Sequence, residues 1–114
     1  MSQLKLQRPE LLEQRCLVGG EWIDAPRMFE VRNPATNEVI ASVPHFGRAE
    51  VEQAITAAAE AMPAWAAQTA KQRAAILRRW FDLMMANIDD LAAIMTAEQG
   101  KPLAEARGEI VYAA

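Results

Sequence analysis

Cysteine and histidine, the side chains that most readily serve as nucleophile and base, are scarce in this sequence. The chain has one cysteine, Cys16, and one histidine, His45. A nucleophile needs an activating base and an orienting group nearby, so this pair is too small a set to define a triad or a metal site. Cys16 lies in a predicted strand, where a small buried hydrophobe is the favoured interpretation. His45 follows Pro44 and is predicted to be a loop residue.

The carboxylate of Glu98 is the charged group that departs from its local pattern. Leu91, Ile94 and Met95 recur at helical spacing, and Glu98 follows at position i+7 on the same apolar stripe. A buried carboxylate needs N–H donors, a cationic partner, a bound cation or a proton. The alternative is that Glu98 lies at the end of the helix, near Gly100, and reaches water. Both interpretations stay open at this stage.

Anion-binding patterns have little support. The sequence has no Gly-x-Gly-x-x-Gly or Walker-type loop. Lys71, Arg78 and Arg79 are spaced as on any amphipathic helix, which favours a solvated face. With 12 Lys and Arg against 15 Asp and Glu, the net charge of −3 provides no basic field for nucleic acid or an acidic membrane surface.

The elements that would position these groups divide into an N-terminal part with strands and a C-terminal part with helices. A Gly19-Gly20 pair between two short apolar runs is typical of a two-residue hairpin, because both turn residues need positive φ. Residues 33–37 contain Pro34 and two asparagines, which predicts a connection between strands. The four predicted strands are 16–18, 21–23, 28–32 and 39–43, and Pro44 ends the extended part.

The C-terminal part of the chain is rich in alanine, because 20 of the 23 alanines lie from Ala49 onward. This composition favours helices. A first helix is predicted from Val51, and Pro63 is expected to close it. Thr69 with Gln72 forms a capping-box pattern that predicts the start of a second helix.

The second helix carries a wide apolar stripe, and the aromatic side chains Trp65, Trp80 and Phe81 are predicted to be core rather than a stacking platform.

Two further helices follow in the predicted pattern. Asn87 or Asp89 is expected to cap the third helix, and Gly100 to end it. Pro102 is predicted at the first position of the fourth helix. That last helix has no stop signal, so the chain is expected to be cut rather than finished.

The composition is that of an ordinary globular protein of one modest domain, with 114 residues, 52% apolar and 24% charged. One cysteine cannot form an internal disulfide, which indicates a reducing compartment. No apolar run approaches the ~20 residues of a membrane-spanning helix. Residues 1–15 are too polar for a signal peptide. We therefore expect a cytoplasmic protein that binds neither membrane nor nucleic acid.

Several segments resemble the aldehyde dehydrogenase superfamily. VGGEWIDA at 18–25 and VRNPAT at 31–36 resemble the opening of that family, and EQGKPLAEARGEI at 98–110 resembles a helix–turn–helix further on. TAKQRAAILRRWF at 69–81 and DDLA at 89–92 are similar to bacterial succinate-semialdehyde dehydrogenases. Each motif alone is weak, but together and in this order they are strong.

The resemblance implies an α/β fold in which this segment supplies N-terminal β-hairpins followed by about four helices packed on the nucleotide-binding sheet. It divides the chain into an N-terminal extension (1–15), a β-hairpin region (16–44) and a helical part of the nucleotide-binding domain (48–114). The family oxidises an aldehyde with NAD or NADP through a cysteine thiolate, a glutamate and an oxyanion-binding asparagine. These groups lie beyond Ala114, and Cys16 does not match the nucleophile's motif. No catalytic or cofactor-binding residue is therefore expected in this chain.

The resemblance also suggests one metal site. Some relatives hold a structural monovalent cation with a backbone carbonyl just before the Asn-Pro turn and an acidic side chain where Glu98 stands. Residue by residue, this proposes the Val31 carbonyl and the Glu98 carboxylate, with a third ligand outside this chain. Oxygen ligands suit such a hard ion.

Three functions are weighed. The leading expectation is the N-terminal part of an NAD(P)-dependent dehydrogenase that oxidises a semialdehyde, succinate semialdehyde foremost, and is a homo-oligomer at full length. The alternative is a self-contained helical binding module without catalysis. Catalysis by the isolated chain is not expected.

Overall fold

The computed structural model describes residues 4–114, so the expected N-terminal extension is described from Leu4 onward and its first three residues lie outside that range. The order of elements is a 3₁₀ turn η1 (Pro9–Leu11), strands β1 (Cys16–Val18), β2 (Glu21–Ile23), β3 (Met28–Arg32) and β4 (Val39–Pro44), then helices α1 (Arg48–Ala67), α2 (Ala70–Ala86), α3 (Ile88–Gln99) and α4 (Leu103–Ala113).

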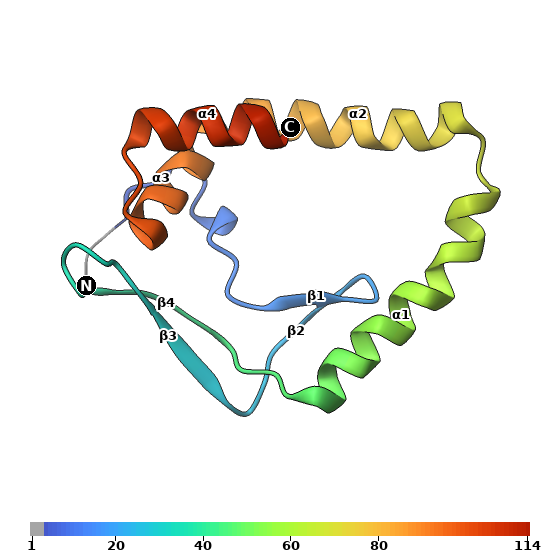
Figure 1. The fold of residues 1–114 in the computed structure, drawn as a ribbon, viewed down its shortest axis with the longest axis horizontal. Helices are drawn as coiled ribbons and strands as arrows, with labels where there is room; N and C mark the ends of the chain where they lie inside the picture. Colours follow the sequence, from blue (N-terminus) through green and yellow to red (C-terminus); the bar gives the residue numbers. More distant parts are fainter. Residues whose placement is uncertain (1–3) are drawn as a thin grey trace.

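The elements are spread out rather than folded into a ball. In Figure 1, α1 and α2 run along two sides of an open frame, with α3 and the hairpins along the others. The frame measures 47 × 34 × 19 Å and its radius of gyration is 16.6 Å. A compact domain of this length has a radius of gyration of about 13 Å. The chain therefore buries much less of its surface than a typical domain of its size.

Both predicted hairpins are confirmed. β1 and β2 pair antiparallel, with Cys16 opposite Ile23, across the Gly19-Gly20 turn. The φ angles of the two glycines are +60° and +83°, the left-handed region that the two-residue turn requires. The hairpin turn lies against α1, because a side chain at Gly19 would be in van der Waals contact with the Ala57 methyl group.

β3 and β4 form a second, separate antiparallel pair, in which Val31 lies opposite Ala41 and Arg32 opposite Val39. The register shifts between Val31 and Arg32, so the ladder is locally disrupted there, as at a β-bulge. In the connecting turn the Asn33 side-chain oxygen accepts a hydrogen bond from the Ala35 N–H at 2.9 Å. This bond and the proline beside it give the turn its fixed shape.

The prediction that Pro63 closes the first helix is wrong, because α1 continues through Pro63 to Ala67. Proline removes one N–H from the helix, which leaves the carbonyl four residues earlier without its partner. Pro63 and Ala59 are both exposed, so water can solvate that carbonyl at low cost. The alanine-rich sequence on both sides supplies the helix propensity that carries the helix past the proline.

The start of α2 is as predicted. The Thr69 hydroxyl accepts a hydrogen bond from the Gln72 N–H at 3.2 Å, and the Gln72 side chain accepts one from the Thr69 N–H at 2.9 Å. The prediction that Trp80 is a core residue is wrong, since its side chain is 63% exposed. Trp65 and Phe81 are half-buried. The amphipathic pattern of α2 is real, but the described residues supply little for its apolar side to pack against.

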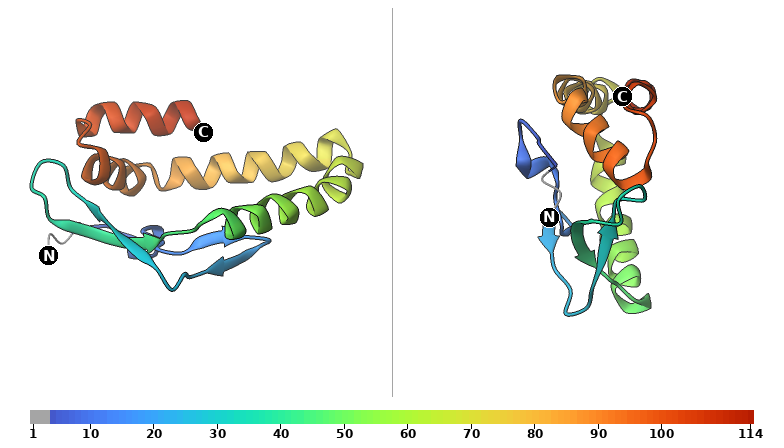
Figure 2. Two further views of the ribbon diagram at one scale, coloured as in Figure 1. Left: turned by 60° about the horizontal axis from the view of Figure 1, so that its bottom comes forward. Right: turned by 90° about the vertical axis from the view of Figure 1, so that its left-hand side faces the viewer.

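The buried core lies between α3 and α4, which pack side by side in Figure 2. Ala92 and Ala106 are completely buried, and Ile110 is nearly so. Half-buried apolar side chains of α3 pack around them, namely Ile88, Leu91 and Met95. The small alanine side chains allow the two helices to approach closely.

The ends of these helices differ in detail from the prediction. Asn87 occupies the N-cap of α3 but makes no capping bond, because its amide donates to the Leu83 carbonyl at 2.7 Å instead. Gly100 ends α3 with φ +79°, as predicted. Pro102 is the N-cap of α4, one residue before the predicted position. None of the helices within residues 4–114 has both the length and the hydropathy that crossing a membrane requires.

Candidate functional site

The acidic residue singled out from the sequence lies in the last turn of α3, where its side chain is exposed. The inward position expected for Glu98 on the helical stripe is therefore corrected, and the alternative that it reaches water at the helix end is what the structure shows. Helix α3 ends one residue later, at Gln99, and the apolar stripe of the helix is uncovered at this position.

The structure brings this helix end to the Asn-Pro turn. A side chain at Gly100 would lie 3.1 Å from the Pro34 ring, so the backbone at the end of α3 approaches the turn closely. Val31 is half-buried at the disrupted rung of β3, three residues before Pro34. The β3–β4 turn and the end of α3 thus share one corner of the fold. Among residues 4–114, no three side chains of His, Cys, Asp or Glu gather into a metal-binding cluster.

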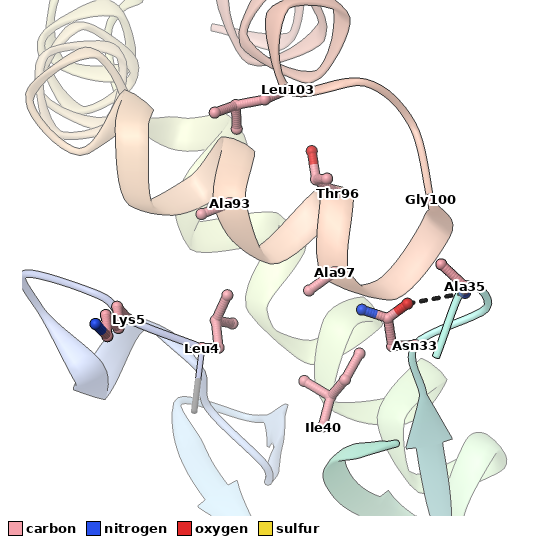
Figure 3. A pocket seen from close by; sticks show the side chains of 10 residues that line it. All are labelled: Leu4, Lys5, Asn33, Ala35, Ile40, Ala93, Thr96, Ala97, Gly100 and Leu103. Atoms are coloured by element: carbon pink, nitrogen blue, oxygen red, sulfur yellow. Dashed lines mark hydrogen bonds between the residues drawn. The ribbon is translucent and has the colours of Figure 1, made fainter. Parts of the chain in front are cut away.

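The same corner contains a cavity of about 500 Å³. Its walls come from the N-terminal segment, the β3–β4 hairpin, α3 and α4 (Figure 3). The side chains that line it are mainly small and apolar, among them Ile40, Ala93 and Ala97. The Asn33 amide is already bonded through its oxygen to the turn. This lining suits the packing of an apolar group, and Lys5 is its one ionisable side chain.

Cys16 and His45 do not form a site with other reactive groups in the described part of the chain. Cys16 is half-buried in β1 and its thiol is free. His45 is exposed just after β4, and its ring lies edge-on to Phe29 with the ring centres 6.1 Å apart. The structure therefore supports Cys16 as a packing residue of a strand and His45 as a loop residue, rather than either as a catalytic group.

Half of the exposed large apolar side chains in the described part of the chain belong to α1 and α2. Trp80 and Ile55 are each 63% exposed, and their neighbours along the two helices are at least half exposed. These side chains are Val51, Ile55, Met62, Ile76, Leu77, Trp80 and Leu83. We call this set the α1–α2 apolar face. Monomeric soluble proteins seldom expose so many large apolar groups, which usually mark a contact surface.

Sequence reasoning missed Asp90, the one buried charged residue among those described. Its carboxylate accepts hydrogen bonds from the backbone N–H groups of Gln7 and Arg8, at 3.0 and 2.8 Å. In the sequence Asp90 looks like any acidic residue in the first turn of a helix. The bonds join segments more than 80 residues apart, so no local signal could have revealed them.

Comparison with known proteins gives these features a context. The aldehyde dehydrogenase family profile matches residues 22–114. Glutarate-semialdehyde dehydrogenase of Pseudomonas putida is 57% identical over 97% of this chain, and succinate-semialdehyde dehydrogenase (NADP+) of Escherichia coli is 55% identical over the same share. The crystal structure of an aldehyde dehydrogenase from Brucella melitensis superposes with a TM-score of 0.91 and 57% identity over 95% of the chain.

The chain belongs to the aldehyde dehydrogenase family. The α/β fold with two hairpins and four helices is the one expected from the sequence resemblance. The matched region is only 24% of the Pseudomonas putida enzyme and 23% of the Escherichia coli enzyme. The chain thus spans about a quarter of the length of these relatives.

Proposed function

We propose that this chain is the N-terminal part of an NAD(P)-dependent dehydrogenase that oxidises a semialdehyde to the carboxylic acid, with succinate semialdehyde as the first candidate substrate. The identity of more than half of all residues to succinate- and glutarate-semialdehyde dehydrogenases supports this proposal. We propose further that the full-length enzyme is a cytoplasmic homo-oligomer that contacts neither nucleic acid nor membrane.

The contribution of this chain to the enzyme is structural. The α1–α2 apolar face packs against the rest of the dehydrogenase, which supplies the catalytic cysteine and the nucleotide-binding strands. The single observation that carries this assignment is the exposure of that face. The chain spans only about a quarter of the length of its relatives, so the proposed remainder of the enzyme is available to cover it. Burying such side chains contributes about 25 cal/mol per Å² of apolar surface to the association.

The alternative of a self-contained helical binding module has less support. Such a module needs a core of its own, whereas the buried apolar residues in the described part are Ala41, Pro44, Ala92, Ala106 and Ile110. Three of these five are alanines, which bury little area. A module of this kind would also keep its large apolar side chains inside.

A chimera tests the proposed function. The N-terminal segment of the Escherichia coli enzyme that matches this chain is replaced by the chain itself. The chimera is expected to reduce NADP+ with succinate semialdehyde, measured by NADPH absorbance, because the two segments are 55% identical. Assays with succinate and glutarate semialdehydes in parallel report any effect of this segment on substrate preference.

Two controls accompany the chimera. The isolated 114-residue chain and the Escherichia coli enzyme without its N-terminal segment are each expected to give no NADPH. A chimera that is soluble and of the correct size but inactive would contradict the proposed function, and so would dehydrogenase activity in the isolated chain.

The cation site is a second component of the proposal. The Val31 carbonyl and the Glu98 carboxylate are the two oxygen ligands that this chain would supply to a sodium or potassium ion. The support is their position at the shared corner of the β3–β4 hairpin and α3, where the disrupted rung interrupts regular pairing of the strand.

Calorimetry of the chain with sodium and potassium chloride tests this site. We expect a saturable heat with one of the two ions, lost in Glu98→Gln and retained in Glu105→Gln. Glu105 is the matched control because it is also an exposed glutamate on a neighbouring helix. The absence of heat with both ions in the unmodified chain would remove the site from this proposal.

A further inference from the structure

Arg73 is a cation on the apolar side of α2, the helix that forms one side of the open frame in Figure 1. Ile76, Leu77 and Trp80 follow it at i+3, i+4 and i+7, the spacings that place side chains on one face of a helix. All three belong to the α1–α2 apolar face and are at least half exposed. Arg73 itself is half-buried, so the charged residue is less exposed than the apolar residues that share its face.

The described part of the chain does not satisfy the Arg73 guanidinium. Its Nε atom is buried and has no hydrogen-bond partner among residues 4–114. None of the ion pairs in that range includes Arg73. Arg73 also lies in the first turn of α2, which contains no acidic residue, so its charge opposes the partial positive charge of the helix N-terminus. Nothing within these residues therefore compensates the placement of a cation on this face.

Covering the face changes the electrostatic situation of Arg73. The proposed function, on which this step rests, places the α1–α2 apolar face under the rest of the dehydrogenase. That contact removes water from the guanidinium, and a buried cation without a partner is strongly destabilising. Arginine stays protonated in proteins, so the charge cannot be relieved by the loss of a proton. The covering surface must therefore supply an acceptor.

We propose that the surface covering α1 and α2 presents a carboxylate, from an aspartate or glutamate in the rest of the same dehydrogenase chain, that pairs with Arg73. A carboxylate matches the planar fork of arginine N–H donors and neutralises the charge. Arg73 and Trp80 are then the two anchors of the contact, since arginine and tryptophan are enriched among the residues that dominate interface energetics. The pair fixes how the segment is seated, because apolar contact by itself is non-directional.

The chimera described above, in which this chain replaces the matching segment of the Escherichia coli enzyme, tests the pair. Arg73→Met keeps a long side chain but removes the charge and the donors. The half-life of NADPH-forming activity at elevated temperature is expected to fall about tenfold or more, because the substitution leaves a buried carboxylate without its partner. Arg73→Lys is expected to lose less, since it keeps the charge without the fork.

Lys71→Met is the matched control. Lys71 is an exposed cation in the same first turn of α2, so both substitutions remove an unfavourable interaction with the helix dipole. It lies on another side of the helix, with Ala74 and Ala75 at i+3 and i+4. The half-life of this chimera is expected not to fall. An Arg73→Met chimera that is insoluble, while the Arg73→Lys and Lys71→Met chimeras stay soluble, supports the pair as well.

The 114-residue chain alone distinguishes a partner inside this chain from one outside it. There Arg73→Met is expected not to lower the urea concentration at the midpoint of unfolding, because the carboxylate belongs to the rest of the enzyme. A loss of stability in the isolated chain as large as in the chimera would place the partner within the chain and overturn the proposal.

Two further results would overturn the proposal and leave the proposed function intact. An Arg73→Met chimera with an equal or longer half-life would show that the guanidinium reaches water at the edge of the contact. Dissociation of that chimera into smaller species, measured by gel filtration, would place the carboxylate on a second copy of the protein. An unmodified chimera that is soluble and of the correct size but inactive would instead contradict the proposed function, and this proposal with it.

Discussion

Replacing Ala106 by leucine is expected to lower the free energy of unfolding of the 114-residue chain by about 3 kcal/mol, at the upper end of the usual cost of overpacking. Ala106 is completely buried and belongs to the same cluster as the completely buried Ala92 of α3. Three additional carbon atoms at this position must push the helices apart or adopt a strained rotamer. Because the rest of the chain has little core to compensate, the loss is concentrated in the α3–α4 pair.

Urea denaturation followed by circular dichroism measures this loss. Ala104→Leu is the matched control, because Ala104 lies on the same helix and is exposed. That substitution is expected to change the free energy of unfolding by less than about 0.5 kcal/mol. Equal stability of the two variants would show that α3 and α4 are not closely packed at Ala106.

Replacing Gly100 by alanine is expected to lower the free energy of unfolding by about 1–2 kcal/mol, for a backbone reason and a packing reason. The backbone of Gly100 has φ +79°, which alanine adopts only with strain. In addition, the new methyl group would lie 3.1 Å from the Pro34 ring, so the β3–β4 turn would have to shift. The second effect disturbs the corner that holds the proposed cation ligands.

Gly108→Ala separates these effects from the general consequence of replacing glycine. Gly108 lies within α4, its φ is not positive, and a methyl group there meets nothing within 4 Å. Alanine in a helix interior is favoured over glycine by about 0.5–1 kcal/mol, so this variant is expected to be more stable than the unmodified chain. Thermal unfolding of the two variants should therefore shift in opposite directions. A shift in the same direction would refute the assignment of strain to Gly100.

Local chemistry made much of the fold predictable. The Gly19-Gly20 turn, the Thr69–Gln72 capping box and the Gly100 helix end were all identified from residues within a few positions of each other. In each case the sequence neighbours themselves form the interaction, or the residue's own backbone freedom decides the conformation. The succession of hairpins and helices and the family resemblance follow from signals of this kind.

Burial and long-range pairing were decided by the tertiary structure alone. Helical periodicity identified the apolar side of α2 correctly, but periodicity cannot tell whether another element covers that side, and Trp80 is exposed. The same reason explains Glu98, which follows the stripe into the last turn of α3 and meets water. Asp90 is the reverse case, an unremarkable acidic residue in sequence that becomes buried because a distant backbone segment donates to it. A spacing along the chain specifies which side chains share a face, whereas the free energy of burying that face depends on what the rest of the chain places against it.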